Sequence, residues 1–135
     1  MALLASCRTM TPSGPEVAVS DQRVEYGAVA VGRVVSEGPG WLVIHSEVNG
    51  APGPDPGWAS VKPGVSRNVR VKIGAAGLTP YLWAMLHVDA GSMGSYEFPG
   101  PDFPVVVAGQ VVMRRFKLNQ GRSGWGMDGG IGRGY

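Results

Sequence analysis

The feature that most constrains the fold is a series of short apolar segments, rich in β-branched residues, that Gly and Pro interrupt along the chain. Eight segments have the character of strands, namely 17–24, 28–36, 41–48, 58–61, 68–73, 81–88, 103–107 and 110–118. Most of the turns between them are short, and short turns join antiparallel neighbours but not parallel ones. No window of ten or more residues has a helical period. The sequence therefore predicts an all-β antiparallel sandwich of seven to eight strands.

Alternation within the segments indicates how they face the core. Val69, Val71 and Ile73 fall on one face of 68–73, and polar residues fall on the other. In 28–36 the odd-numbered residues, from Val29 to Val35, are likewise expected to share a face. The segments 41–44 and 81–86 are apolar on both faces, which is typical of central strands.

Length and composition indicate one compact domain between polar ends. The chain has 135 residues, 44% of them hydrophobic and 16% charged, which is too apolar for a disordered protein. We expect a linker at 8–15, the sandwich at 16–118 and a Gly-rich flexible tail at 119–135. The net charge of +2 is too small to indicate a nucleic-acid partner, and none is expected.

The first seven residues suggest where the protein is located. Leu4, Ala5, Ser6 and Cys7 match a lipobox, in which the cysteine becomes acylated, and a polar Pro/Ser/Thr linker follows. Only six residues precede Cys7, so a full secretory signal is missing, and 1–7 is interpreted as its remnant. A bland N-terminal tail is the alternative. The lipobox predicts a membrane-anchored lipoprotein, extracellular or periplasmic, with Cys7 as the lipidation site and the membrane as a partner.

A set of motifs resembles a known family. The order is Asp21-Gln22, Val43 to His45, Met85-Leu86-His87, Asp89 to Gly94, and then Tyr96 to Gly100 with Asp102. This arrangement, over about 20–118, is similar to a family of uncharacterised extracellular domains in secreted proteins and lipoproteins of bacteria and archaea, catalogued as a domain of unknown function. The resemblance implies an immunoglobulin-like sandwich and an extracellular location. It implies no activity, because the family has none established.

The two histidines are the candidate metal ligands. His45 and His87 each lie near the end of an apolar strand, and Asp89 and Glu97 could complete a copper- or zinc-type site. Their spacing matches no known ligand motif, so no cofactor is expected and a metal ion is the alternative. In the structural interpretation, His87 hydrogen-bonds a carboxylate or a backbone carbonyl and holds the following loop in shape.

The loop after 81–88 holds most of the remaining candidate residues. We interpret four residues as structural parts of this loop: Asp89, Tyr96, Glu97 and Asp102. A calcium-binding loop that starts at Asp89 would need side-chain oxygens at its third and fifth positions, but Gly91 and Met93 stand there and provide none. No nucleophile elbow or phosphate-binding loop occurs, and we expect no enzyme.

Three hypotheses for function remain. The first is a non-enzymatic module of the cell envelope, with an adhesion, scaffolding or binding role and a protein or carbohydrate partner. Burial in the core is the favoured interpretation of the tryptophans, with partial exposure as the alternative for Trp58, which follows a Pro/Gly loop. The second is a metal-binding extracellular domain that uses His45 and His87. The third is a self-associating subunit of an extracellular fibre, assembled by exchange of a strand or segment.

Overall fold

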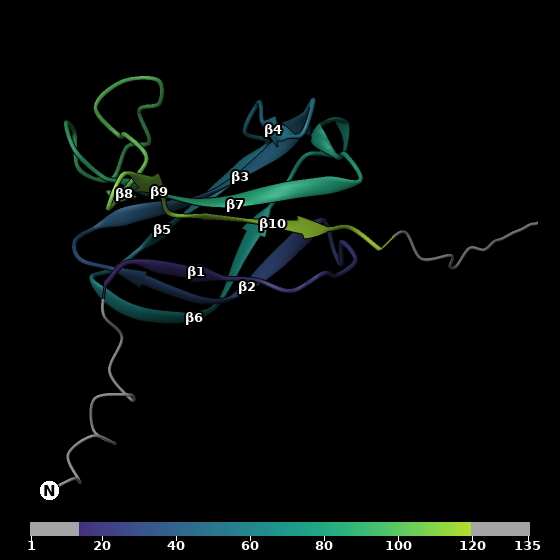
Figure 1. Ribbon diagram of the computed structural model, residues 1–135, viewed down its shortest axis with the longest axis horizontal. Helices are drawn as coiled ribbons and strands as arrows, with labels where there is room; N and C mark the ends of the chain where they lie inside the picture. The colour runs from purple at the N-terminus through teal and green to yellow at the C-terminus, as the bar shows by residue number, and fades with distance from the viewer. Residues whose placement is uncertain (1–13, 120–135) are drawn as a thin grey trace, which may run out of the picture.

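A computed structural model of the chain describes residues 14–119, which form two packed antiparallel sheets (Figure 1). The first sheet has the order β1 (Glu16–Ala18), β2 (Ala28–Ser36), β6 (Gly64–Lys72). The second has the order β10 (Met113–Lys117), β7 (Tyr81–Val88), β3 (Gly40–Val48), β5 (Gly57–Val61). The smaller elements are β4 (Ala51–Pro52), the hairpin of β8 (Val106–Val107) and β9 (Gln110–Val111), and one 3-10 turn, η1 (Ala75–Gly77).

The prediction of an all-β antiparallel sandwich is confirmed. The three strands of the first sheet face a sheet of five, in which β10, β7 and β3 are neighbours and β3 also pairs with β4 and β5. The middle strands were predicted within one residue of their ends, but β6 begins four residues before the predicted 68–73. Among the described residues, no helix is long and apolar enough to span a membrane.

The core lies between the sheets and consists of alternating side chains. Val29, Val31 and Val71 face it from the first sheet, and Leu42, Ile44, Leu82, Leu86 and Phe116 face it from the second. Each of these side chains is at most 2% exposed. Burial of one such side chain stabilises a fold by about 1.5–3 kcal/mol, so the strands hold together through apolar packing.

The predicted alternation of β2 is wrong beyond Gly32. Val34, not Val35, joins the core, so the inward face changes from odd to even residue numbers. The ladder between β2 and β6 passes over the pair Gly32 and Asn68, and Asn68 has a φ of 51°. Asn tolerates this left-handed conformation. The irregular pair lies where the inward face of β2 changes, as at a β-bulge.

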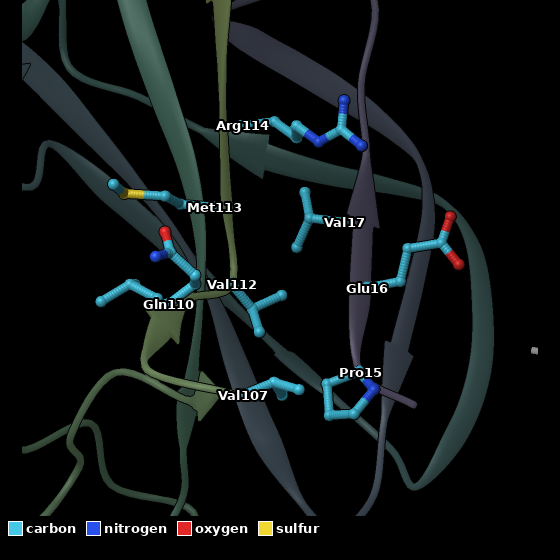
Figure 2. A pocket seen from close by; sticks show the side chains of 9 residues that line it. Pro15, Glu16, Val17, Val107, Gln110, Val112, Met113 and Arg114 are labelled. Carbon is cyan, nitrogen blue, oxygen red and sulfur yellow. The ribbon is translucent and has the colours of Figure 1, made fainter. Parts of the chain in front are cut away.

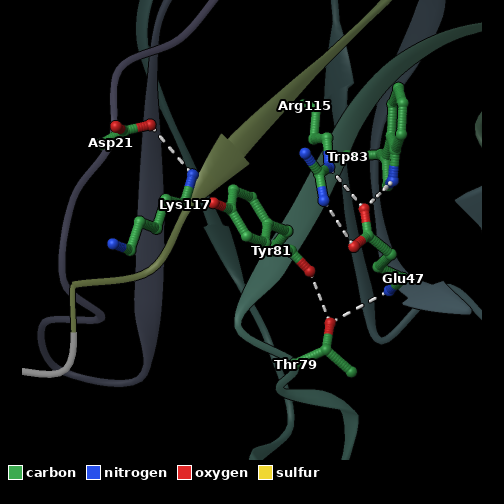
Figure 3. A network of polar contacts seen from close by, with 7 residues as sticks. All are labelled: Asp21, Glu47, Thr79, Tyr81, Trp83, Arg115 and Lys117. Carbon is green, nitrogen blue, oxygen red and sulfur yellow. Dashed lines mark hydrogen bonds and ion pairs between the residues drawn. The ribbon is translucent and has the colours of Figure 1, made fainter. Parts of the chain in front are cut away.

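The predicted first strand, 17–24, is divided between the two sheets. β1 pairs with β2 only as far as Ala18. Further on, the side-chain amide of Gln22 replaces a backbone partner for β2, since it donates to the Ala30 oxygen and accepts from the Ala30 nitrogen, both at 2.8 Å. The main chain of Gln22 pairs with Leu118, and Asp21 accepts a hydrogen bond from the Lys117 nitrogen at 2.9 Å (Figure 3). The Asp21-Gln22 motif therefore joins the two sheets.

The two ends of the described chain lie far apart. It begins beside β1, at the same end of the sandwich as the loop 89–105, and it leaves at the opposite end after β10 (Figure 1). Near the beginning, a groove opens between β1 and β9–β10, lined by the apolar side chains of Pro15, Val17, Val107 and Val112 (Figure 2). The predictions for 1–7 with Cys7, for most of the linker and for 120–135 fall outside the described residues.

Candidate functional site

The loop 89–105 packs on the outer face of the second sheet, at the upper left of Figure 1. That face has Trp41, Val43 and His45 from β3 beside Met85 and His87 from β7. All five side chains are buried, although they point away from the core between the sheets. Both faces of β3 and β7 are apolar because one face packs against the first sheet and the loop 89–105 covers the other.

Asp102 holds this loop in its shape. The Asp102 side chain is fully buried and accepts two backbone hydrogen bonds, from Ala90 at 2.7 Å and from Glu97 at 2.8 Å. Its backbone oxygen contacts Nδ1 of His87 at 2.9 Å. A buried carboxylate needs such partners, and here they join the two ends of the loop to β7.

His45 and His87 meet on the sheet. Their Nε2 atoms are 3.5 Å apart and their ring centroids 5.6 Å apart, so the two nitrogens lie on the line between the rings. Nδ1 of His45 is 2.8 Å from the Gly53 oxygen, and Nδ1 of His87 faces the Asp102 oxygen. Both Nδ1 atoms must donate to these carbonyls, so an imidazole Nε2 that carries no proton is an acceptor and faces the other ring.

Burial determines the charge of His87. Removal of the ring from water disfavours the imidazolium and lowers the pKa of His87, while the hydrogen bond to the Asp102 backbone opposes this shift. Phe98 packs against His87 in a T-shaped contact, with ring centroids 4.7 Å apart at 87°. His87 is therefore neutral at neutral pH and holds the loop as a hydrogen-bond donor.

The predicted carboxylates do not join the histidines. Asp89 accepts a hydrogen bond from the Gly94 nitrogen at 3.0 Å, and Glu97 accepts one from the Ser92 nitrogen, also at 3.0 Å. Among residues 14–119, no group of three or more His, Cys, Asp or Glu side chains gathers in metal-binding geometry. Of the four predicted metal ligands, only His45 and His87 therefore lie close together; Asp89 and Glu97 do not join them.

A row of three aromatic rings lies on the surface of this loop and sheet, and is called here the aromatic row: Trp58, Tyr96 and Phe98. The centroids of Trp58 and Tyr96 are 4.5 Å apart, and those of Tyr96 and Phe98 are 6.4 Å apart. Trp58 is 46% exposed and Phe98 is 36% exposed, so the outer members of the row face solvent. Beneath them, Trp41 supports Tyr96 at 5.6 Å.

Asp55 fixes the middle ring of the row. The Tyr96 hydroxyl donates to Asp55 at 2.7 Å. Burial, and then this hydrogen bond, raise the pKa of Tyr96 far above its usual range, so the phenol stays protonated and donating. Sequence reasoning favoured the core for Trp58, which is exposed here, and it missed Asp55, whose only signal was its position in the Pro/Gly loop before β5.

Glu47 organises the other end of the same sheet face and was also missed (Figure 3). It forms a bidentate pair with Arg115, at 2.6 Å and 2.8 Å, and accepts from the Trp83 indole at 2.9 Å. The Arg115 hydrogen bond lowers the pKa of Glu47, and the guanidinium lies 3.7 Å over the centroid of the Tyr81 ring. These contacts brace β3, β7 and β10.

Comparison with curated proteins gave no significant match, and comparison with solved structures gave none. A family described as a domain of unknown function, DUF7282, does match, over residues 15–119. The matched range contains the sandwich, the loop 89–105, the histidine pair and the aromatic row. The predicted resemblance to a domain of unknown function is therefore confirmed, and the chain belongs to the DUF7282 family.

Proposed function

We propose that this protein is a non-enzymatic binding module of the cell envelope, anchored through a lipid on Cys7, and that the aromatic row is its contact surface. The observation that carries the proposal is a set of exposed rings on a rigid support. Trp58 comes from β5, and Tyr96 and Phe98 come from a loop that Asp102 and His87 fix to β7. Preorganised aromatic side chains contribute strongly to binding, because little conformational entropy is lost when a partner stacks on them.

The polar groups of the loop support a binding role over catalysis. The carboxylates of Asp89, Glu97 and Asp102 each accept backbone hydrogen bonds within the loop. Both histidines use Nδ1 to hold a backbone carbonyl. These groups maintain the shape of the surface, so the chemistry they offer a partner is limited to recognition.

The surface fits a carbohydrate chain. Two exposed rings, Trp58 and Phe98, flank the half-buried Tyr96 and offer apolar surface, and the faces of sugar rings are apolar too. The carboxylates of Asp55 and Glu97 lie beside the row as acceptors for hydroxyl groups. An extended polymer can contact both exposed rings at once, and we therefore propose a polysaccharide of the cell surface as the partner.

Binding of soluble polysaccharides by the full chain, measured by affinity electrophoresis and calorimetry, tests the proposal. Trp58→Ala should weaken binding at least tenfold, since truncation of a central aromatic contact costs about 2 kcal/mol or more. Tyr26→Ala is the matched control, because Tyr26 is 95% exposed and lies outside the row. Equal binding by both variants, or no binding to any polysaccharide, would contradict the assignment.

The lipid anchor has its own test. The supporting observation is Leu4-Ala5-Ser6-Cys7 followed by a Pro/Ser/Thr segment. When the gene is expressed with its native upstream sequence, mass spectrometry of the membrane fraction should show an acylated N-terminal cysteine, and Cys7→Ser should abolish it. Two acyl chains anchor a protein stably, whereas one is marginal. An unmodified Met1 in a soluble product would remove the anchor from the proposal.

The histidine pair supports a second candidate function, metal binding. Two Nε2 acceptors 3.5 Å apart can both reach one ion at the usual metal–nitrogen distance of about 2.0–2.1 Å. Thermal unfolding with Zn²⁺ or Cu⁺, and after chelation, measures this directly. A metal-dependent rise in melting temperature that His45→Ala removes would support the candidate. An unfolding curve that metal and chelator leave unchanged would exclude it.

The third hypothesis, a fibre built by segment exchange, stays a prediction. Its acceptor would be the groove between β1 and β9–β10 (Figure 2). The edge strand β6 has exposed Arg67, Arg70 and Lys72 and the irregular Asn68, devices that commonly oppose edge pairing.

A further inference from the structure

Positive charge collects on the outer face of the β1-β2-β6 sheet, on the side opposite to the aromatic row. Val69 and Val71 pack toward the core, so Arg70 and Lys72 point outward from β6. Val34 also packs inward, so Arg33 points outward, and its cross-strand partner Arg67 does the same. These four residues are called here the basic face: Arg33, Arg67, Arg70 and Lys72.

The basic face lacks matching carboxylates. Arg33 and Arg67 are directly opposite each other in the ladder, and like charges in such a pair repel. Glu16 is 3.8 Å from Arg33, whose buried Nε has no hydrogen-bond partner. Within residues 14–119, Arg67, Arg70 and Lys72 form no ion pair. Arg33 and Arg67 repel each other across the ladder, and an anionic partner would relieve that repulsion.

The face is also flat. The residues between the cations have small side chains, since Ala18 lies opposite Arg33, and Ala30 lies opposite Arg70. Gly32 is exposed in the middle of β2. No large side chain of β2 rises between the cations, so all four can contact one planar surface together.

We propose that the basic face docks on the anionic phospholipid headgroups of the membrane that holds the anchor. This inference rests on the proposed lipid anchor for its choice of partner. The described chain begins beside β1, a strand of the same sheet. Residues 8–15 between Cys7 and β1 span at most about 27 Å, so a lipid on Cys7 keeps this sheet close to the bilayer.

Docking gives the domain a defined orientation. With the basic face on the membrane, the second sheet and its aromatic row face away from it (Figure 1). The carboxylates of Glu47, Asp55, Asp89 and Glu97 belong to that outer side. The separation of charge between the two faces thus turns the carbohydrate-binding surface outward.

The experiment uses the full chain with Cys7→Ser, so that no lipid contributes to binding. It measures sedimentation with vesicles of phosphatidylcholine alone and of phosphatidylcholine and phosphatidylglycerol in equal parts. We expect binding to the anionic vesicles only, with loss at high salt. Each cation near an anionic surface strengthens binding about fivefold, so Arg67→Gln with Arg70→Gln should weaken it about 25-fold.

The matched control is Arg115→Gln with Lys117→Gln, which removes the same charge from β10; Phe116 between them packs into the core, so both side chains are on the outer face of the other sheet. The control should bind within about twofold of the parent, because its cations face away from the lipid. Absence of binding to anionic vesicles, or equal loss in both double variants, would overturn the proposal. Binding to a soluble acidic polysaccharide with no binding to vesicles would overturn it as well.

The outcomes separate this inference from the proposed anchor and contact surface. Acylation of Cys7 is read by mass spectrometry and does not depend on the basic face. Carbohydrate binding depends on Trp58, which the vesicle assay leaves intact. Failure of vesicle binding alone refutes membrane docking, and failure of acylation alone refutes the anchor.

Discussion

Replacement of Asp102 by Ala should be the most damaging single change to the candidate site. The substitution removes a fully buried carboxylate and leaves the backbone nitrogens of Ala90 and Glu97 without their acceptors. A hydrogen bond to a charged group contributes about 1.5–3 kcal/mol, so two lost bonds give about 3–6 kcal/mol. Both nitrogens are only partly buried, and water can satisfy them in part, so the lower end of about 3 kcal/mol is expected.

That loss is large for a domain of this size. Small domains unfold with about 5–15 kcal/mol in total, and 1 kcal/mol corresponds to about 4–8 °C in melting temperature. Urea unfolding followed by tryptophan fluorescence measures it, because Trp41 and Trp58 contact the loop through Tyr96. A transition of the loop before the main one would show that the loss is local.

Asp89→Ala is the matched control for Asp102→Ala. Asp89 lies in the same loop and makes one exposed hydrogen bond, to the Gly94 nitrogen. Its replacement should cost less than about 1 kcal/mol. If Asp102→Ala unfolds within about 0.5 kcal/mol of the parent protein, or if the two variants lose equal stability, then Asp102 does not hold the loop.

Four further predictions concern His87, Gly57 and Arg115. The pKa of His87 is lowered in the folded domain, so below about pH 6.5 the unfolded chain binds more protons than the folded one. The free energy of unfolding should therefore fall with decreasing pH, by at most about 1.4 kcal/mol per pH unit. Urea midpoints at three pH values measure this fall, and His87→Asn should abolish it. His87→Ala should cost about 1–3 kcal/mol by leaving the Asp102 oxygen unpaired, and unchanged stability with lost ligand binding would make His87 a functional residue. Gly57→Ala should prevent tight packing of β5 on β6, because a Cβ there would lie 2.0 Å from the Lys72 oxygen, and a melting temperature equal to that of the parent would contradict this. Arg115→Met should change the free energy of unfolding very little, since its pair with Glu47 is partly exposed, and a clear loss of stability in urea would show that the network in Figure 3 acts as a unit.

The main strands could be predicted because their residues carry local signals. β2, β3, β5 and β7 consist of apolar and β-branched residues between Gly or Pro turns, and their observed ends match the prediction within one residue. The division of 17–24 and the start of β6 at Gly64 were not predictable. They depend on partners far away in the sequence, such as Leu118 for Gln22.

The candidate site was predictable in composition but not in geometry. The residues after Val88 were identified as the place where polar and aromatic side chains gather, and the structural interpretation of His87 as a donor that holds the loop agrees with its contact to the Asp102 carbonyl. Tyr96 and Phe98 pack on the outer face of the second sheet, which no sequence pattern indicated. Alternation in the sequence shows which side chains share a face of a strand, but it does not show which part of the chain packs on each face.

The sequence by itself determined the fold class, because apolar alternation and turn residues act over a few residues. The tertiary structure decided everything that depends on long-range contact. It brings His45 to His87 across 42 positions of sequence and Asp55 to Tyr96 across 41. It also opposes Arg33 to Arg67, which gives the first sheet its basic face. Strand register and loop folding set these distances through the packing of the whole domain, and no local pattern records that packing.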